Sequence, residues 1–503
     1  MQNRSDVLII GAGGAGLVSA ISACESGADV IVITKEYPTR SQTSMAQGGI
    51  NAPFGNVSED SVEQHIKNTL ASAHGIADEN AINYMCSNAK DAVEWLDSIG
   101  VCFSRTPDAK IAQRKLGGAS APRACYAQDY TGLKILHTLY DRCNALGIEM
   151  LNERYLLDLV VEDSSVVGAN VLNIRSGEVE LYESNSIILA TGGYSRIYDK
   201  YSTNSTATSG DGIASALRAG VKLSNMEFIQ FHPTALKDAS ILISESARGA
   251  GGYLLNSKNE RFVDELLPRD EVARAIYDEI QKGEDIFLDI RHLGEEFIDE
   301  ELPQERKLAK LYENIDPVSQ LIPIKPVAHY SMGGIDVDAN TQTNIKGLFA
   351  VGECANHHVH GANRLGGNSL LELVVFGKVA GVSAYKHSLE TTTKKLEKVI
   401  NPEFGSKDIS VDFYAIKEEL GEIFYNYVGI SRDKDGLTYA LKKVDEFIAS
   451  LPQMGATDKS TIYNTNRIEF LEFKNMLSLS KIIVQDALKR EESIGAHYRV
   501  DFK

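Results

Sequence analysis

The sequence contains no run of about 18 apolar residues free of glycine and charge, which argues against a membrane-spanning helix. Basic side chains are also fewer than acidic ones: 51 lysines and arginines stand against 69 aspartates and glutamates, for a net charge of −18. Because non-specific nucleic-acid binding needs basic residues that neutralise phosphates, this balance argues against DNA or RNA as a partner. A local cluster of arginine and histidine could still bind an anionic substrate.

The six cysteines include no C-x-x-C pair. This spacing disfavours an iron–sulfur cluster, a structural zinc or a dithiol redox centre within the chain, and we predict no metal site. A reduced, cytoplasmic protein is the simplest interpretation. The 503 residues suffice for two to four domains at roughly 100–200 residues per domain.

The N-terminal apolar segment has two interpretations. Val7 to Cys24, behind Arg4, could be a signal peptide. However, its glycines form the pattern G-x-G-x-x-G between a strand at 6–11 and a helix at 12–26, and a second strand follows at 28–34. We favour a βαβ unit of a parallel sheet whose glycine turn binds the phosphates of a dinucleotide.

The rest of the chain divides by pattern. Strand-like runs at 155–161, 186–190 and 348–351 favour continuation of an α/β fold, and the last two lead into glycine-rich turns. The character changes at about 231–335, where a helix is expected around 270–282, and it becomes helical and charged from about 390, notably at 413–424 and 468–491. We predict a Rossmann-like nucleotide-binding domain (1–230 and 335–389) split by an inserted α+β capping domain (231–334), then a C-terminal helical domain (390–503).

The second predicted strand lacks the usual acidic residue at its end. Thr34 stands there, followed by Lys35 and Glu36. An acid at this place normally binds the adenosine ribose, so its absence makes an ordinary NAD dehydrogenase less favoured and leaves the ribose contact open.

Several ordered motifs carry a family resemblance. The chain resembles the flavoprotein subunits of the fumarate reductase and succinate dehydrogenase family, which includes L-aspartate oxidase. The resemblance covers about residues 1–390 and a further stretch at 491–501. The matching motifs are T-R-S-Q-T-S-M-A-Q-G-G-I-N at 39–51, F-H-P-T at 231–234, S-E-S-A-R-G at 244–249, P-R-D at 268–270, H-Y-S-M-G-G at 329–334 and H-G-A-N-R-L-G-G-N-S-L-L at 360–371.

The resemblance implies that the nucleotide-binding domain is an FAD-binding domain and that the protein is a flavoprotein oxidoreductase of electron transport or anaerobic respiration. Taken alone, Asp211 or Glu353 would more often be a helix cap or a solvated acid, but each stands in a glycine turn that favours a cofactor contact. The implied cofactor-binding residues are Gly11, Gly13, Gly14, Gly16, Thr34, Lys35, Ser41, Gln42, Thr43, Ala46, Gln47, Gly48, Gly49, Ala190, Thr191, Gly192, Asp211, Glu353, Ser369 and Leu370.

One departure from the family concerns how the flavin is attached. Many members link FAD covalently to the histidine of an R-S-H-T motif, whereas this chain has Gln42 in that position. We therefore expect non-covalent FAD. Since a covalent link tends to raise the flavin potential and favour succinate oxidation, its absence favours fumarate reduction or aspartate oxidation.

The family's substrate-binding positions fall on His232, Ser244, His329 and Arg364. Arginine suits bidentate carboxylate binding, and histidine can donate a hydrogen bond while buried, as a C4-dicarboxylate substrate requires. A lone buried histidine such as His232 is more often a satisfied core residue; the matching motifs around it favour the substrate role.

By the same resemblance, Arg269 is the proton-transferring arginine, with Glu245 and Arg248 as a relay to solvent. This role is demanding because arginine effectively never deprotonates in proteins. The structural alternative is that Arg269 only stabilises charge and pairs with Asp270.

The run His357-His358-Val359-His360 looks like a metal cluster, but no clear carboxylate set stands nearby, and His360 belongs to a family run beside the flavin. Arg291 and His292 are expected on the surface of the cap.

Fumarate and aspartate remain the two leading substrates. Aspartate oxidases usually place a glutamate before the Gly117-Gly118 pair, where it can bind the substrate ammonium; this chain has Leu116, which favours fumarate. L-aspartate oxidase, which produces iminoaspartate for NAD biosynthesis, is the alternative. A third interpretation, a flavin-binding electron-transfer or assembly component, is disfavoured because a mere carrier needs no substrate set.

The expected partner is an iron–sulfur subunit or another electron donor, with peripheral association at the inner membrane face through that subunit and no direct membrane insertion. Many members of membrane complexes continue past the G-A-H-Y-R-V-D-F region at 495–502, whereas this sequence ends at Lys503, which puts the iron–sulfur partnership in doubt.

Overall fold

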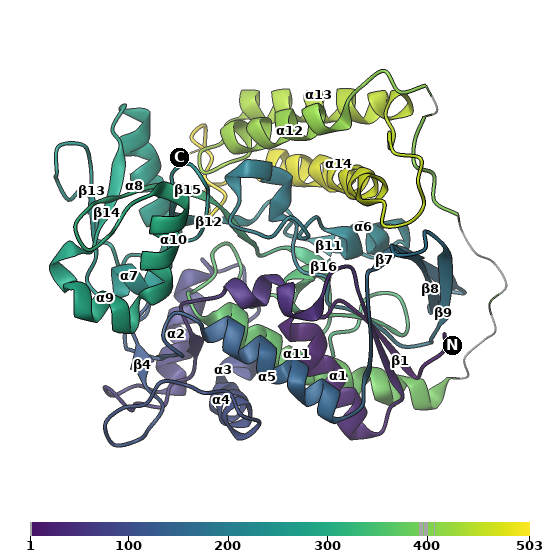
Figure 1. Cartoon of the computed structure of the whole chain (residues 1–503), viewed down its shortest axis with the longest axis horizontal. Coiled ribbons are helices and arrows are strands. Elements are labelled where there is room, and N and C mark those ends of the chain that lie inside the picture. The colour runs from purple at the N-terminus through teal and green to yellow at the C-terminus, as the bar shows by residue number, and fades with distance from the viewer. Residues whose placement is uncertain (1–2, 392–395, 397–400, 407, 503) are drawn as a thin grey trace.

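The computed structural model describes residues 3–391, 396, 401–406 and 408–502, and Figure 1 shows their arrangement. Its centre is a five-stranded parallel sheet of order β17-β10-β1-β2-β6. The Val/Ile-rich strands are buried because helices cover the sheet, as is usual for parallel strands. The strands are β1 (Val7–Ile10), β2 (Val30–Thr34), β6 (Glu149–Asn152), β10 (Ile187–Leu189) and β17 (Leu348–Ala350).

The predicted βαβ unit is confirmed, with parallel β1 and β2 on either side of α1 (Gly14–Ser26). Helix α1 packs along α11 (Asn368–Glu390), where Gly377 and Gly381 allow close approach to α1. The other helices of this region are α2 (Val62–Ser72), α3 (Glu79–Ser87), α4 (Ala89–Ser98), α5 (Thr131–Ala145) and α6 (Asp211–Arg218), with 3₁₀ turns at Pro38–Arg40, Gln42–Met45, Ser195–Tyr201 and Gly352–Cys354.

Smaller sheets flank the parallel one. The predicted strand at 155–161 forms, but it belongs to an antiparallel sheet with two following strands rather than to the parallel sheet. These sheets are β7 (Arg154–Glu162), β8 (Ser165–Asn173) and β9 (Val179–Glu183); β3 (Ile50–Asn51), β5 (Ala124–Cys125) and β4 (Gln113–Arg114); and β11 (Leu223–Ser224), β16 (Gly334–Asp336) and β18 (Ala355–Asn356).

The inserted segment forms a separate antiparallel sheet of order β12-β15-β14-β13 with its own apolar core. The expected helix at 270–282 is found one residue earlier. Residues 231 and 335 lie inside β12 and β16, so the predicted domain boundaries fall within strands. The elements are β12 (Ile229–Leu236), β13 (Tyr253–Leu255), β14 (Ile286–Asp289), β15 (Ile322–Ser331), α7 (Glu245–Gly249), α8 (Arg269–Gln281), α9 (Glu295–Glu301), α10 (Pro303–Glu313) and a 3₁₀ turn at Arg291–Leu293.

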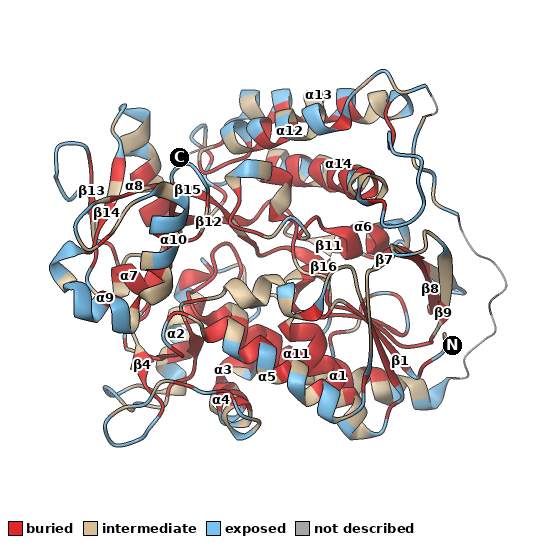
Figure 2. Ribbon diagram, in the orientation of Figure 1, coloured by how far each residue is buried: buried red, intermediate tan, exposed pale blue. Residues whose placement is uncertain are grey.

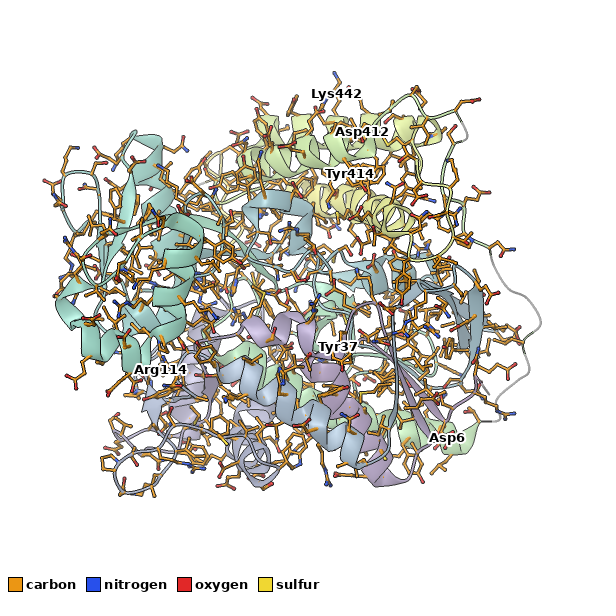
Figure 3. The ribbon with its side chains drawn as sticks, in the orientation of Figure 1. Asp6, Tyr37, Arg114, Asp412, Tyr414 and Lys442 are labelled. Carbon is orange, nitrogen blue, oxygen red and sulfur yellow. The ribbon has the colours of Figure 1, made fainter. Side chains whose placement is uncertain are left out.

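Three helices, α12 (Phe413–Tyr427), α13 (Lys434–Ser450) and α14 (Thr465–Lys489), form the predicted C-terminal helical region, with a 3₁₀ turn at Leu451–Gln453. Their buried faces point toward the rest of the molecule, and charged residues such as Lys442 point outward (Figures 2 and 3). Residue 390 ends α11, while residues 392–395, 397–400, 407 and 503 of this predicted domain lie outside the described residues. Among the described helices, none combines the length and apolar character needed to cross a membrane.

Candidate active site

The glycine loop follows β1 and opens α1. Gly11 has a φ of 110°, and a Cβ on it would lie 2.2 Å from the Ala190 carbonyl oxygen of β10's end, so only glycine fits. A Cβ on Gly16 would lie 2.0 Å from the Gly11 carbonyl oxygen. Gly13 precedes α1 and supplies no side-chain cap, while the Gly14 N–H donates to Thr43 Oγ1 at 3.0 Å. The loop is therefore built for close approach of a phosphate to a helix N-terminus.

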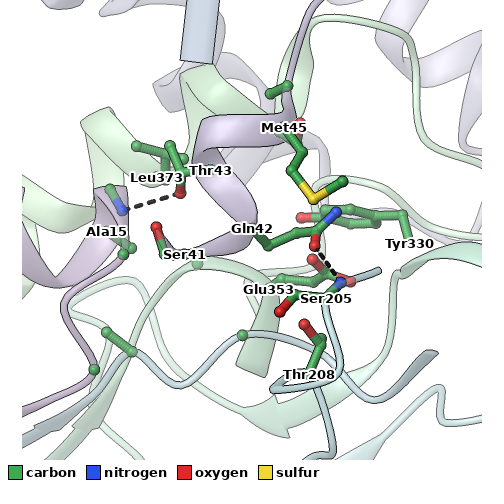
Figure 4. A pocket seen from close by; sticks show the side chains of 18 of the residues that line it. Ala15, Ser41, Gln42, Thr43, Met45, Ser205, Thr208, Tyr330, Glu353 and Leu373 are labelled. Atoms are coloured by element: carbon green, nitrogen blue, oxygen red, sulfur yellow. Dashed lines mark hydrogen bonds between the residues drawn. The ribbon is translucent and has the colours of Figure 1, made fainter. Parts of the chain in front are cut away.

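One continuous cleft runs from this loop to the inserted domain, and Figure 4 shows part of its lining. Nineteen of the twenty predicted cofactor residues line the cleft. Gly16 is the exception: it packs beneath the loop against the Gly11 carbonyl oxygen and does not line the cleft, so its cofactor contact stays a prediction. The predicted residues that line the cleft at the inserted domain are His232, Ser244, Glu245, Arg269, His329 and Arg364, together with Leu116.

Unsatisfied polar atoms show that the cleft suits a ligand rich in hydrogen-bonding groups. Ser41 Oγ, Gln47 Oε1 and Thr191 Oγ1 are buried and have no partner among the described residues, and all three side chains line the cleft. Buried polar atoms are normally satisfied. Together with the glycine loop, these atoms fit FAD, whose pyrophosphate and ring system offer many donors and acceptors.

Lys35 makes a buried ion cluster at the end of β2. Its Nζ lies 2.7 Å from Asp211 Oδ2 and 2.5 Å from Glu472 Oε1 of α14. Burial alone would lower the pKa of Lys35, but the two carboxylates outweigh burial and raise it. Directly after Thr34, which stands in place of the usual ribose-binding acid, an ion cluster thus joins the cleft to the C-terminal helices. Glu472 was not predicted, because it is 437 residues from Lys35 in sequence.

Glu353 lies deeper in the cleft, on the turn after β17. Its Oε1 accepts hydrogen bonds from the Ser331 N–H and Oγ, each at 3.0 Å. Burial raises the pKa of Glu353 to about 7. The side chain is therefore poised between its neutral and charged forms near neutrality and can either donate or accept a hydrogen bond.

Arg269 is the first residue of α8 and is 7% exposed. Its Nε and Nη2 donate to Glu245 Oε2 at 2.9 and 2.5 Å, and its Nη1 donates to Gln230 Oε1 at 3.1 Å. The alternative pairing with Asp270 is wrong, since Asp270 instead accepts from Arg274 and Asn363. The guanidinium is held by a fork that fixes its plane at the edge of the cleft.

Arg364 shares one partner with Arg269. Its Nη2 donates to the same Gln230 Oε1 at 3.1 Å, and its guanidinium lies 4.3 Å above the Tyr330 ring. Burial, and then the charge of Arg269, lowers the pKa of Arg364 to about 10. Two like charges therefore face the same part of the cleft, which favours a negatively charged ligand there.

The two predicted histidines stand side by side, with ring centroids 4.9 Å apart. His232 Nδ1 accepts from the Thr234 N–H at 3.2 Å, and His329 Nδ1 lies 2.7 Å from Thr203 Oγ1. Neither Nε2 has a partner among the described residues, so it is the ring atom available to a ligand. Burial and neighbouring charges lower the pKa of both rings well below the usual value, so both are neutral hydrogen-bonding groups.

Ser244 precedes α7 and caps it. Its Oγ accepts from the Ser246 N–H at 3.1 Å and from Ser246 Oγ at 2.6 Å, which leaves its own proton free for a ligand. Leu116 also lines the cleft and is 2% exposed. The cleft wall is therefore apolar at this position.

Arg248 does not line the cleft but lies behind Glu245. Its Nη2 is 3.7 Å from Glu245 Oε1, and its Nη1 donates to the Glu265 carbonyl oxygen. Burial alone would raise the pKa of Glu245, but Arg269 and Arg248 outweigh burial and hold it below its usual value. The order Arg269, Glu245, Arg248 forms a chain of charged groups leading away from the cleft toward Glu265, which pairs with the exposed Arg261.

The clustered histidines do not converge on a metal site. His358 pairs with Asp336 at 2.8 Å, His360 pairs with Glu372 at 2.9 Å, and His357 stacks on Phe376. The described residues contain no group of three potential ligands arranged for a metal ion. His360 does not line the cleft, although it reaches the cleft-lining Tyr330 through Glu372. Arg291 and His292 are exposed on the inserted domain, as predicted.

Two buried polar side chains that hold the arginines of the cleft were not predicted. Gln230 is fully buried and joins the two arginines through one amide oxygen, and it stands two residues before His232 on β12. Tyr330 supports Arg364 and donates its OH to Glu372 at 2.7 Å. Tyr330 lies inside the motif at 329–334 and Gln230 directly precedes the motif at 231–234, and this position was the signal that could have found them.

Comparisons with known proteins agree with this geometry. Residues 6–370 match the model of the FAD binding domain, and residues 417–503 match that of the fumarate reductase flavoprotein C-term. The chain is 38% identical to the succinate dehydrogenase flavoprotein subunit of Rickettsia felis over all of this chain and 91% of that protein. It is also 38% identical to the 8-methylmenaquinol:fumarate reductase flavoprotein subunit of Wolinella succinogenes, over 99% of this chain and 86% of that one.

Solved structures share the fold of this chain over nearly its whole length. A quinol fumarate reductase variant from Escherichia coli superposes with a TM-score of 0.94 at 35% identity, over 100% of this chain and 92% of that chain. The Sdh1 complex of Mycobacterium smegmatis gives a TM-score of 0.86 at 34% identity, over 99% of this chain and 89% of that chain.

Proposed function

Because the chain belongs to the family of fumarate reductase and succinate dehydrogenase flavoprotein subunits, we propose that it is an FAD-dependent oxidoreductase that interconverts fumarate and succinate, with fumarate reduction as the favoured direction. The observation that best supports this proposal is the net positive charge of the buried groups at the inserted-domain end of the cleft. Arg269, Arg364 and the nearby Arg248 are three buried cations, and Glu245 is the buried anion among them. The surplus of two positive charges matches a dicarboxylate dianion.

The substrate is held between neutral donors and charged ones. We assign Arg364 and His329 to one carboxylate, and His232 and Ser244 to the other. Neutral histidines suit this role because each can donate from Nε2 without adding a further buried charge. Arginine supplies the planar fork that matches a carboxylate.

Arg269 acts as the proton donor of fumarate reduction. FAD, when bound, supplies the redox chemistry by carrying the hydride equivalent. Arg269 presents its guanidinium to the cleft and gives a proton to one alkene carbon, while Glu245 Oε2, which contacts both Nε and Nη2, hands a proton back. Arg248 and the Glu265 region continue this path toward solvent.

The direct test is reoxidation of the flavin. Purified holoprotein is reduced chemically without oxygen, and the flavin absorbance is followed as fumarate or L-aspartate is added to the reduced and oxidised forms. We expect fumarate to restore the oxidised spectrum and L-aspartate to leave the oxidised flavin unchanged. Rapid bleaching by L-aspartate would make the protein an aspartate oxidase, and absence of any response to fumarate would leave only an electron-transfer or assembly role.

Leu116 is expected to decide between the two substrates. In Leu116→Glu, a carboxylate at the cleft wall can pair with the substrate ammonium, so L-aspartate should bleach the flavin at a rate at least about tenfold above the unmodified protein, equivalent to about 1.4 kcal/mol. Leu116→Gln is the matched control, since it adds a polar group of the same shape without the charge. Equal aspartate turnover in both variants would show that Leu116 does not set the specificity.

We propose that FAD is bound without a covalent link. Gln42 Oε1 accepts the Ser205 N–H at 2.8 Å in the cleft (Figure 4), and an amide cannot form the histidyl–flavin bond. His65, the nearest histidine in sequence, is buried against Asn368 and does not line the cleft. Acid precipitation should therefore release all the FAD into the supernatant. Flavin that stays with the precipitated chain, or that migrates with it in a denaturing gel, would contradict non-covalent binding.

The electron donor is expected to be a partner subunit carrying iron–sulfur clusters. The support is the family itself, since the relatives are named as flavoprotein subunits and the chain spans about nine-tenths of their length. Co-purification from the native source with an iron-containing chain would identify it, whereas a monomeric holoprotein reduced directly by a soluble carrier would point to a different donor.

A further inference from the structure

A buried acid that the proposed reaction does not use lies directly behind the substrate-binding Ser244. Glu305, in the first turn of α10, is 0% exposed, and its Oε1 accepts the Ser244 N–H at 3.0 Å. Its Oε2 is also buried and has no hydrogen-bond partner among the described residues. A carboxylate in such surroundings would leave one charged oxygen unsolvated, whereas a carboxylic acid carries a proton there.

A second buried acid faces Glu305 from the FAD-binding domain. Asp129, just before α5, is 0% exposed, and its Oδ2 accepts the N–H groups of Gln304 at 2.6 Å and Glu305 at 3.3 Å. Asp129 thus satisfies the N-terminal N–H groups of α10 across the boundary between the two domains. Its Oδ1 is buried without a described partner as well. Two adjacent buried carboxyls cannot both ionise cheaply, so one of them retains a proton.

The other ionisable groups around this acid pair leave the balance negative. Arg114 of β4 is the cation that faces the pair, and it forms no ion pair with either carboxyl within the described part of the chain: its Nη2 donates to the Gln128 carbonyl oxygen instead. Tyr126 and Tyr130 are neutral near pH 7, and Glu301 at the end of α9 adds a further negative charge near Arg114.

We propose that Glu305 is a positioning residue of the dicarboxylate site: as a neutral carboxylic acid it accepts the Ser244 N–H from behind the cleft, and the charge of Asp129 keeps it in that form. The proposal rests on the proposed function, because it concerns how Ser244 is presented to a dianion. A neutral acceptor fixes the Ser244 backbone without placing a negative charge behind the pocket that must bind two carboxylates.

The electrostatics of the pair agree with this assignment. Burial, and then the charge of Asp129, raises the pKa of Glu305 well above the ordinary value. Burial raises the pKa of Asp129 to about 6, and the two backbone N–H groups that it accepts oppose a larger rise. As the pH rises through neutrality, Asp129 therefore loses its proton first and Glu305 keeps its own.

Deprotonation of Glu305 is expected to weaken fumarate binding. At high pH, Glu305 loses its proton, a negative charge appears one residue from the bound dianion, and the KM for fumarate rises. Glu305→Gln keeps the acceptor and the shape but cannot ionise, so its KM should stay at the low-pH value and lose the Glu305-dependent rise. Asp129→Asn removes the charge that holds the proton on Glu305, so the rise should move to lower pH.

The kinetic experiment measures KM and kcat for fumarate against pH in the holoenzyme and its variants. Glu305→Ala, which deletes the acceptor of a buried N–H, should raise KM by roughly five- to tenfold with kcat changed less than about twofold, and Glu305→Gln should restore the low-pH KM. Glu313→Gln is the matched control, because Glu313 lies on the same helix and accepts the Asp238 N–H at 2.9 Å in a solvent-accessible position. A pH profile of Glu305→Gln identical to that of the unmodified protein would overturn the proposal.

An infrared measurement separates this proposal from the proposed function. Near neutral pH, the difference spectrum between the holoprotein and Glu305→Gln should contain the C=O stretching band of one buried protonated carboxyl, a band that Glu313→Gln retains, whereas the contribution of Glu353 cancels. If the band is found and fumarate is not turned over, the function fails and the neutral Glu305 stands. If fumarate is turned over and Glu305→Gln removes no such band, the neutral Glu305 is refuted and the function stands.

Discussion

Replacement of Arg269 by alanine should lower fumarate turnover by at least about a thousandfold while the protein retains FAD. A positioned general acid typically contributes about 10²–10⁴ in rate, and Arg269 also supplies one of the cations that face the dianion. The variant leaves Glu245 buried with Arg248 at 3.7 Å as its remaining cation, so some loss of stability accompanies the loss of activity. The measurement is kcat for fumarate with a reduced artificial donor, together with the flavin content per chain.

Two further variants separate proton donation from charge. Arg269→Lys keeps a cation near Glu245 but cannot reach both Glu245 Oε2 and Gln230 Oε1 with a planar fork, so it should fold as well as the unmodified protein and still turn over at least about tenfold more slowly. Lys282→Ala removes an exposed cation just beyond the same helix and should be neutral. Turnover of Arg269→Ala within tenfold of the unmodified protein would exclude Arg269 as the proton donor.

The sequence was sufficient for the parts of the site that depend on local pattern. The glycine loop needs glycine because a Cβ at Gly11 would collide with the Ala190 carbonyl, and that requirement is visible as G-x-G-x-x-G after a strand. The periodicity of the C-terminal segment also predicted α12 and α14 to within a few residues. Ordered motifs placed His232 and Arg364 in one cleft, although that inference came from a resemblance and not from their spacing.

The parts that could not be predicted are contacts between distant segments. Gln230 joins Arg269 and Arg364 because β12, α8 and the turn before α11 meet at the cleft, which no local pattern encodes. Glu305 reaches Ser244 across 61 residues only because α10 packs beside α7. A buried acid in a helix with a polar sequence reads as an ordinary surface residue, so its role appears only when the fold places it.

The ion cluster at Lys35 also depends on contacts between residues that are far apart in sequence. The missing acid at the end of β2 was recognised, but its meaning was left open, because Lys35 finds Asp211 and Glu472 only in the folded chain. The cluster connects the cleft beside the end of β2 to α14. The C-terminal helices therefore help to fix the position of a side chain that lines the cleft.

Replacement of Arg364 by glutamine should abolish dicarboxylate binding and leave the unliganded holoprotein equally stable or more stable. Arg364 is 3% exposed, its Nε has no described partner, and Arg269 lies nearby with the same charge. A pKa lowered from 12.5 to about 10 corresponds to a destabilisation on the order of 3 kcal/mol. Because the charged form is disfavoured in the fold, this penalty is fully present below about pH 10, fades as the pH rises from about 10 to 12.5, and is gone above the unfolded-state pKa.

Thermal unfolding with and without succinate tests both expectations. For the unmodified protein, a dicarboxylate in excess of its Kd should raise Tm, because it binds the folded state and neutralises the surplus positive charge. In Arg364→Gln, the unliganded Tm should be equal or higher by a few degrees, and the succinate-dependent rise should disappear. Arg291→Gln, at an exposed pair with Asp289, should keep the full rise. A buried cation that serves to bind a ligand should destabilise the fold until the ligand neutralises its charge. If Arg364→Gln instead unfolds at a lower temperature and still responds to succinate, Arg364 stabilises the fold and the dianion binds elsewhere.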